Sequence, residues 1–318
     1  MTLPRSDHFN GKTFFQGHHA GALRHRDFWR WQLTARRKAW PRTVAVPPQP
    51  SPPAPAADQV VITWIGHASF LLQTPTANLL IDPVFSERVS PVHWAGPRRV
   101  HPPGVALAAL PPIHTVLLSH DHYDHCDLAS LRALASRHDP EFVAPLRHRD
   151  LLTAAGAKRI TELDWWQTHP VAGGASLTLT PSKHWSNRLG TPRNYRLWGG
   201  FFLKLGSKRV WFVGDSGYDA EIFRAVRQHG GPPDAALVPI GAYEPRWFMR
   251  PMHMNPADAV QLHRDVGARL SIAMHWGTFR LTDEGRDDPV EALVAARTAA
   301  GVDAGDFRVI APGASVVV

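Results

Sequence analysis

The residues best suited to chemistry lie in one short stretch, His120-Asp121-His122-Tyr123-Asp124-His125. It directly follows an apolar run, Thr115–Ser119, which reads as a buried strand. Neutral imidazole and carboxylate groups are ligands that suit zinc, manganese or ferrous iron. Side chains 120 and 122 can point to the same side of an extended loop, and residues 124 and 125 continue around it. So many histidines and aspartates at one strand end are hard to explain structurally, and the stretch predicts a metal site.

Three later residues repeat this context, because each lies just past an apolar run: His184, Asp215 and His275. Strand ends of an α/β core converge at one edge, where active sites usually form. Taken singly, either histidine could be structural. Taken with the stretch 120–125, these residues supply enough ligands for two ions. A carboxylate such as Asp215 can bridge a metal pair and hold it roughly 3.5–4 Å apart.

The pattern His-x-His-x-Asp-His, followed by a distant His, Asp and His, resembles the metallo-β-lactamase superfamily. Wider motifs make the chain similar to the branch of N-acylphosphatidylethanolamine-hydrolysing phospholipase D, whose relatives include bacterial ascorbate-6-phosphate lactonases. These motifs lie between about residues 60 and 284 and are Thr63-Trp-Ile-Gly-His-Ala68, Ile81-Asp-Pro-Val-Phe-Ser86, Gly96-Pro-Arg-Arg99, Ser119–His125, His184-Trp185, Gly214-Asp-Ser-Gly217 and Ala273-Met-His-Trp-Gly-Thr-Phe279.

The resemblance implies an α/β fold, the αββα four-layer sandwich, with two Zn²⁺ ions (Mn²⁺ or Fe²⁺ as alternatives). One ion would be held by His120, His122 and His184, and the other by Asp124, His125 and His275, with Asp215 bridging. Two cations lower the pKa of a bridging water towards neutrality, and the resulting hydroxide attacks phosphorus or a carbonyl carbon. Asp124 is also a candidate catalytic residue that orients this nucleophile.

Two further residues are candidates for supporting the metal loop. Asp82 matches the early aspartate of the superfamily and would fix a histidine tautomer from behind the ligands. The alternative is an ordinary turn aspartate before Pro83. His67 lies between two small residues and either faces the site or makes a structural hydrogen bond.

Candidate substrate contacts follow from the same resemblance. His253 would bind substrate or protonate the leaving group, unless it only contacts the start of a helix. Arg98 and Arg99 could engage a phosphate bidentately, or be solvated and salt-bridged instead. An acyl groove could be lined by the aromatic residues Tyr243, Trp247 and Phe248, which could equally be core. Cys126 is read as a small buried side chain rather than as a ligand.

The elements that must position these residues are short strands followed by mixed strands and helices. Apolar runs predict strands at Val60–Trp64, Phe70–Gln73, Asn78–Ile81, Thr115–Ser119, Leu177–Thr180, Phe201–Leu205, Val210–Val213, Ala236–Pro239, Leu270–Met274 and Arg308–Ile310. Amphipathic patterns predict helices at roughly 127–138, 147–155, 219–228, 256–267 and 289–300. Asn255 and Pro256 suit the N-cap and first position of one helix. Two sheets with helices outside are expected.

The chain divides by composition into three parts. Residues 41–56 are rich in proline and predict an extended linker. Residues 1–40 form an N-terminal extension in which Arg24–Trp40 mixes basic and aromatic side chains. This segment suits either an anionic membrane surface or packing across the sandwich. Residues 57–318 form the predicted catalytic domain.

Net charge, cysteine count and the length of the apolar runs indicate which class of protein this is. The 318 residues carry a net charge of +8, with a pI of about 10.1, which favours anionic partners without choosing among them. A single cysteine excludes an intramolecular disulfide and fits a reducing cytoplasm. No signal peptide or transmembrane run is expected. We expect a cytoplasmic protein, with peripheral contact to the inner membrane face and self-association into a homo-oligomer both left open.

The leading hypothesis is a zinc phosphodiesterase of phospholipase D type acting on N-acylphosphatidylethanolamine-like lipids. An alternative keeps the metal centre and hydrolyses a soluble phosphorylated lactone or another small ester. Nucleic-acid processing is suggested only by the basic pI, and no nucleic-acid partner is expected. A non-catalytic metal-binding scaffold is the remaining alternative.

Overall fold

The computed structural model describes residues 3–16, 25–47, 49 and 54–318. Within these ranges two seven-stranded mixed sheets face each other. The first sheet has the order β14-β1-β2-β3-β4-β5-β6. Its strands are β1 (Val61–Gly66), β2 (Ser69–Gln73), β3 (Asn78–Ile81), β4 (Thr115–Leu117), β5 (Glu141–Pro145), β6 (Arg159–Leu163) and β14 (Ser315–Val317). The pairings from β3 to β6 are parallel, and the others are antiparallel.

The second sheet has the order β13-β12-β11-β10-β9-β8-β7. Its strands are β7 (Thr168–Val171), β8 (Ala175–Thr180), β9 (Gly200–Leu205), β10 (Lys208–Phe212), β11 (Ala235–Pro239), β12 (Ser271–Met274) and β13 (Phe307–Arg308). The pairings from β10 to β13 are parallel, whereas β7, β8, β9 and β10 pair antiparallel. Both sheets therefore contain parallel strands whose carboxyl ends can build a site.

The core between the sheets follows from the alternation of side chains along each strand. Ile62 and Trp64 of β1 face the same buried cluster as Phe201 and Leu203 of β9. Their neighbours point the other way, as Phe202 does towards the outer face of the second sheet. Both faces of each sheet are thus apolar, which forces a further layer onto each outer face.

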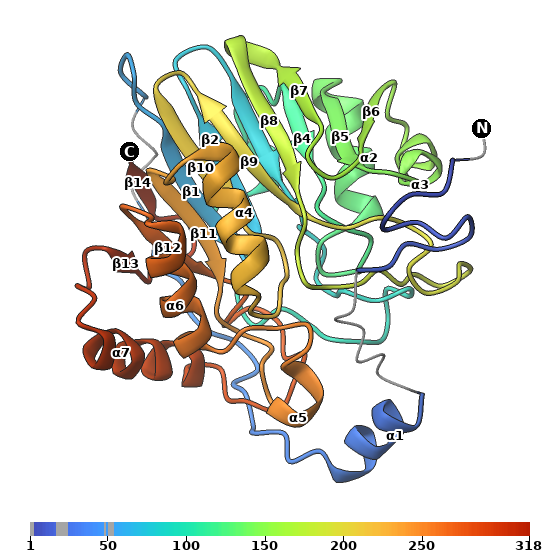
Figure 1. Ribbon diagram of the computed structural model, residues 1–318, viewed down its shortest axis with the longest axis vertical. Helices are drawn as coiled ribbons and strands as arrows, with labels where there is room; N and C mark the ends of the chain where they lie inside the picture. The colour runs from blue at the N-terminus through green and yellow to red at the C-terminus, as the bar shows by residue number, and fades with distance from the viewer. Residues whose placement is uncertain (1–2, 17–24, 48, 50–53) are drawn as a thin grey trace.

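Helices provide these outer layers (Figure 1). The buried side chains of α2 (Leu128–His138) and α3 (Arg149–Ala154) pack on the first sheet. The second sheet is covered by α4 (Ala220–Gly230), α6 (Pro256–Val266) and α7 (Asp288–Ala300). Two 3-10 turns lie at Leu107–Ala109 and Ala172–Gly174. The predicted αββα sandwich is confirmed, as are the N-cap at Asn255 and Pro256 at the start of α6.

The N-terminal extension packs against the sandwich at two places. Phe9 and Phe14 are buried in the core cluster between the sheets. Further along, α1 (His25–Thr34) lies beside α5 (Arg246–Met249), where Trp31 stacks on Phe248 with ring centroids 5.1 Å apart. The Trp31 indole also donates to Asp283 at 3.0 Å. Of the two expectations for the segment Arg24–Trp40, packing against the sandwich accounts for this side of α1. Arg24 and part of the predicted linker 41–56 lie outside the described residues.

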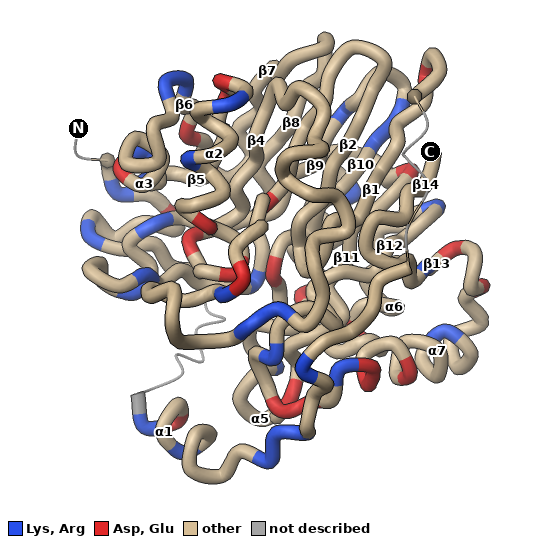
Figure 2. The backbone as a smooth tube through the Cα atoms, turned by 180° about the vertical axis from the view of Figure 1, so that it is seen from behind, with Lys and Arg blue, Asp and Glu red and all other residues tan. Residues whose placement is uncertain are grey.

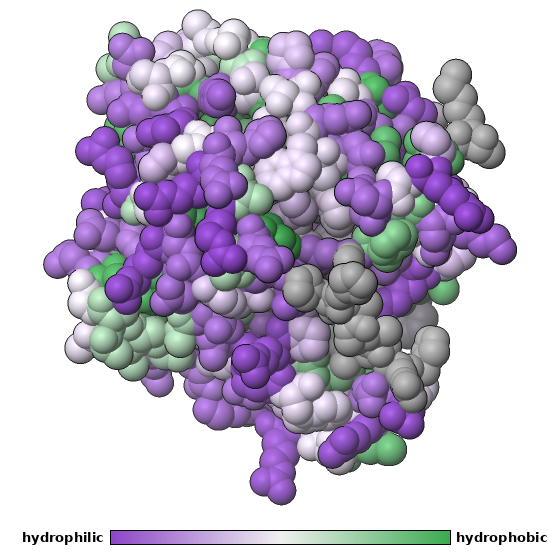
Figure 3. Space-filling model, in the orientation of Figure 1, coloured by the Kyte–Doolittle hydropathy of each residue, from purple (hydrophilic) through white to green (hydrophobic). Residues whose placement is uncertain are grey.

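No helix in the described part of the chain is long and apolar enough to cross a membrane. The face seen in Figure 3 is mostly hydrophilic, with a more hydrophobic patch over α7.

Candidate metal centre

The first set of convergent side chains consists of three imidazoles, those of His120, His122 and His184. Nδ1 of His122 lies 2.9 Å from Nε2 of His120 and 3.2 Å from Nε2 of His184. The first two come from the loop after β4, and His184 follows β8 of the other sheet. Burial lowers the pKa of His120 and of His184 well below the usual value, so both rings are neutral. Neutral imidazoles offer lone pairs to a cation.

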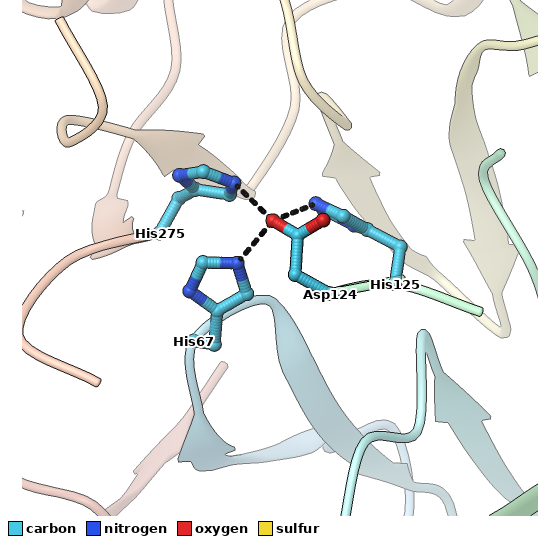
Figure 4. Close-up of side chains that lie close together, drawn as sticks. All are labelled: His67, Asp124, His125 and His275. Carbon is cyan, nitrogen blue, oxygen red and sulfur yellow. Dashed lines mark hydrogen bonds and ion pairs between the residues drawn. The ribbon is translucent and has the colours of Figure 1, made fainter. Parts of the chain in front are cut away.

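The second set contains Asp124, His125 and His275. Oδ2 of Asp124 lies 3.4 Å from Nε2 of His275 and 3.6 Å from Nε2 of His125. His67 approaches the same oxygen from another direction, with its Nε2 at 2.9 Å (Figure 4). Three segments of the chain thus meet at one carboxylate.

Asp215 lies between the two sets. Its Oδ2 is 3.1 Å from Nε2 of His275, 3.3 Å from Nε2 of His125 and 3.7 Å from Nε2 of His184. The turn that delivers Asp215 from β10 needs glycine at 214, where φ is +69° and a Cβ would lie 2.7 Å from the carbonyl oxygen of Gly199. A position between the sets is the one a bridging ligand requires.

The charges of this cluster compensate one another. Burial by itself would raise the pKa of Asp215, but the charges of His275 and His125 outweigh burial and hold it well below the usual range. Burial would lower the pKa of His275, yet Asp215 and Asp124 raise it to about 9. The carboxylates therefore stay ionised and can serve as anionic ligands.

The hydrogen bonds made by the outward-facing nitrogen of each imidazole show whether its inward-facing nitrogen can bind a metal. Nδ1 of His120 lies 2.9 Å from Oγ of Ser119, and Nδ1 of His184 lies 3.1 Å from the carbonyl oxygen of Met252. A proton placed on each Nδ1 leaves the Nε2 lone pair facing inward. The Nε2 atoms of His125 and His275 are buried without a hydrogen-bond partner among the described residues. This donor set fits transition-metal cations.

Asp82 lies directly behind the metal loop. Its Oδ1 accepts the Ser119 amide at 2.7 Å, and its Oδ2 accepts the Ser119 hydroxyl at 2.5 Å and Nδ1 of His125 at 2.7 Å. The side chain is fully buried. These contacts are those of a residue that fixes the His125 tautomer, rather than those of an isolated turn aspartate.

His67 and His253 both lie beside the cluster. The backbone carbonyl of His67 accepts the His275 amide at 2.9 Å, in addition to the side-chain contact with Asp124. Nδ1 of His253 lies 4.0 Å from Oδ2 of Asp215, and its ring centroid is 5.1 Å from that of His184. His253 thus points at the site from the segment between α5 and α6.

The predicted phosphate-binding arginines have other partners. Arg98 pairs with Glu87, and both side chains are more than half exposed. Arg99 donates to the carbonyl oxygens of Val84 and Ser86 at 2.8 and 3.0 Å. Its guanidinium carbon lies 5.3 Å from the Phe279 ring centroid. Neither guanidinium has a contact with a side chain of the two sets among those described.

The aromatic residues expected to line an acyl groove are divided. Phe248 is buried against Trp31, as described above. Tyr243 and Trp247 line a pocket of about 600 Å³ between α5, α7 and the segment after α1. The other walls carry Arg36 and Lys38 together with the carboxylates Glu244, Asp283, Glu284, Asp288 and Glu291. These charged groups surround the two aromatic side chains, so the pocket is mixed in character. Cys126 is fully buried in the cluster under α2, as expected of a small core residue.

Sequence reasoning missed three residues that hold the metal loop from outside: Asp121, Arg188 and Arg196. All three are buried, and they link the loop 120–126 to the segment that carries His184. Asp121 belongs to the metal motif but had no role assigned. The two arginines lie in an irregular segment without any motif, so only the contacts reveal them.

Comparisons with known proteins show what the chain is similar to. A family model described as a beta-lactamase superfamily domain matches residues 77–276. An uncharacterised protein of Mycobacterium tuberculosis is 40% identical over 273 residues, which cover 84% of this chain and 72% of that protein. A metallo hydrolase from the archaeon Ignicoccus hospitalis has a similar fold, with a TM-score of 0.61 and 22% identity over 82% of this chain and 98% of its own.

Relatives from a nematode and from yeast are named as N-acyl-phosphatidylethanolamine-hydrolyzing phospholipases D. The N-acyl-phosphatidylethanolamine-hydrolyzing phospholipase D 1 of Caenorhabditis elegans is 37% identical over 226 residues. The matched region covers 68% of this chain and 64% of the nematode protein. The family model, these relatives and the sandwich place the chain in the metallo-β-lactamase superfamily, on a branch like that of the N-acylphosphatidylethanolamine-hydrolysing phospholipases D.

Proposed function

We propose that this metal-dependent hydrolase is a dinuclear zinc phosphodiesterase of phospholipase D type that acts on N-acylphosphatidylethanolamine-like lipids. The observation that carries the proposal is the position of Asp215, within 3.7 Å of imidazole nitrogens from both ligand sets. The similarity to a relative named for this lipid supports the substrate class.

In this proposal His120, His122 and His184 would hold one ion, and Asp124, His125 and His275 would hold the second, with Asp215 as a ligand shared by both. Two such cations would supply an activated water and positive charge for the developing oxyanion. His67 holds the Asp124 carboxylate, and Asp82 holds the His125 ring. Hydrolysis adds the water oxygen to phosphorus, breaks the bond from phosphorus to the ethanolamine oxygen, and transfers a proton to that oxygen. His253, beside Asp215, is the residue placed to deliver this proton or to bind the phosphate.

The surface beside α5 supports a lipid substrate. Three apolar side chains of α1 are exposed, Phe28 at 43%, Trp29 at 63% and Leu33 at 84%. Basic residues lie on α1 and just after it (Figure 2), including Arg26 and Arg30. Aromatic and basic side chains on one short helix suit the interface of an anionic bilayer. His253 lies four residues after the end of α5, the helix against which α1 packs.

The assay uses zinc-reconstituted protein and vesicles that contain N-acylphosphatidylethanolamine. We expect equal amounts of N-acylethanolamine and phosphatidic acid. In ¹⁸O-labelled water, the label should enter the phosphatidic acid, because water attacks phosphorus. The variant Asp215→Asn is the matched inactive control. No product at any zinc concentration, from protein that binds two metals, would exclude this substrate.

A soluble substrate is the second candidate, and the charged side chains around Tyr243 and Trp247 in their pocket favour it. The same metal centre would then cleave a phosphorylated lactone or another small ester. Turnover of such compounds without turnover of the lipid in vesicles would select this candidate.

A further inference from the structure

We propose that Asp121, Arg188 and Arg196 form a buried clamp that positions His184 against His120 and His122, and so sets the metal affinity of the first ligand set. The proposal rests on the ligand roles proposed above. It concerns residues that are not themselves ligands. It predicts that loss of the clamp weakens the binding of one metal and not of the other.

Asp121 is the central member of the clamp, with its side chain only 1% exposed. Its Oδ1 accepts the amide of Asn187 at 2.9 Å, and its Oδ2 accepts Nη1 of Arg196 at 3.2 Å. Because Asp121 lies between His120 and His122, its side chain leaves the loop on the side that faces the segment after His184. The motif's non-ligating carboxylate therefore bonds the two ligand-bearing segments together.

Arg188 holds both ends of the metal loop at once. Its Nη1 donates to the carbonyl oxygens of Asp121 and Cys126 at 2.9 and 3.0 Å. Its guanidinium carbon lies 4.3 Å from the ring centroid of Tyr123, in the middle of the loop. The distance between the loop's two ends is thereby fixed. Within this span His125 has a separate anchor in Asp82, so the contact acts chiefly on the direction of His122.

Arg196 ties the same unit to the first sheet's helix layer. Its side chain is 2% exposed, and Nη2 lies 2.6 Å from Oδ2 of Asp150 on α3. A buried guanidinium is costly unless it is well paired. Asp121 is its buried counter-charge, whereas Asp150 is exposed. Loss of Asp121 therefore leaves Arg196 paired only with a surface carboxylate, and loss of Arg196 leaves the buried Asp121 carboxylate without this cation.

The second ligand set is anchored by other contacts. The His125 ring is held by Asp82, and the backbone amide of His275 is held by the carbonyl of His67. Neither contact involves a residue of the segment 184–198. Weakening the clamp should therefore loosen the site that contains His184 and spare the site that contains His275.

The test measures stepwise zinc affinity by competition with a chromophoric chelator, together with the Tm of the metal-free protein. Arg188→Met should lower the affinity for one of the two metals 10-fold to 100-fold, the range found when outer partners of ligands are removed, and leave the other unchanged. Arg188→Lys, which keeps one donor to one carbonyl, should recover part of the loss. Arg196→Met and Asp121→Asn should each weaken the same metal.

Arg297→Met is the matched control. Arg297 on α7 also donates to backbone carbonyls, those of Ala304 and Phe307, and these lie outside both the metal loop and the segment 184–198. It should lower the Tm without changing either zinc affinity. Equal weakening of both metals in Arg188→Met, or a loss of zinc affinity in Arg297→Met as large as that in Arg188→Met, would overturn the clamp. If Arg188→Met does not fold, the test uses Arg188→Lys instead. Wild-type affinity for both metals in that variant would also overturn the clamp. Wild-type protein that binds no zinc would instead reject the proposed function.

Discussion

Oδ2 of Asp82 lies 2.7 Å from Nδ1 of His125, and both side chains are fully buried. This contact places the His125 proton on Nδ1 and leaves Nε2, which has no other hydrogen-bond partner in the described chain, directed at Asp124 and Asp215. The ring cannot rotate without losing a charge-assisted bond in a dry environment. Asp82 therefore fixes the orientation of His125, which we propose as a ligand.

Replacement of this carboxylate gives the first prediction. In Asp82→Asn one end of the side chain can no longer accept, so a donor from Ser119 or His125 is left unpaired and buried. We expect zinc affinity to fall about 10-fold to 100-fold, measured by chelator competition. Asp234→Asn is a suitable control, because Asp234 accepts the Arg209 amide at 2.9 Å at a distant turn. Unchanged affinity in Asp82→Asn would mean that the contact has no influence on the ligand.

The second prediction concerns Asp215. Because its Oδ2 approaches both ligand sets, Asp215→Asn should lower the zinc content from two ions per chain towards one and abolish turnover together. Metal analysis and the vesicle assay on the same sample check this. Asp219→Asn, at the N-cap of α4, should keep both metals. A fully active Asp215→Asn protein with two zinc ions would exclude the bridging role.

The layered fold and the ligand cluster could be predicted from sequence because polar residues follow long apolar runs. Strands β5, β6, β7 and β14 were not predicted. β5 lies inside the first sheet and is short, and the other three lie at sheet edges. β6 is mostly half-exposed, and β7 contains Pro170, so neither has the apolar pattern of an inner strand. The contacts of Arg188 and Arg196 with Asp121 span 67 and 75 residues. No local pattern encodes such contacts, because they depend on how two sheets meet.

The third prediction separates a role in turnover from a role in metal binding. His253 lies beside Asp215, and Nη1 of Arg246 holds its carbonyl oxygen at 2.8 Å. We expect His253→Gln to retain both zinc ions while kcat falls about 10²-fold to 10⁴-fold, the usual contribution of a general acid. A rise in KM at constant kcat would assign His253 to substrate binding instead. Loss of one zinc ion would show that it belongs to the ligands.

The fourth prediction is a pH dependence of stability. Burial lowers the pKa of His101 from 6.5 to about 4. Between these two pH values the unfolded chain takes up a proton at this residue and the folded chain does not. The free energy of unfolding is therefore unaffected by this residue above pH 6.5, and it decreases as the pH falls from 6.5 towards 4.

Denaturant titrations of the free energy of unfolding between pH 7 and pH 4 check this. His101→Gln should show a smaller fall in stability than wild type over that window, because the other buried histidines contribute equally to both proteins. His93→Gln, at an exposed position, should behave like wild type. Equal slopes for all three proteins would contradict the prediction.

The fifth prediction tests the surface of α1. Trp29 and Leu33 expose large apolar side chains, whereas Trp31 on the other side of the helix anchors it to Phe248 and Asp283. The double variant Trp29→Ala, Leu33→Ala should therefore keep the fold and its Tm but lose most binding to vesicles that contain phosphatidylglycerol.

Wild-type binding should weaken with salt, because the arginines of α1 contribute electrostatically. Val294→Ala, which truncates an exposed apolar side chain on α7, is the control. Co-sedimentation of the double variant at the wild-type level would exclude α1 as the membrane contact, whereas loss of binding with intact hydrolysis of detergent-dispersed lipid would place its role in docking alone.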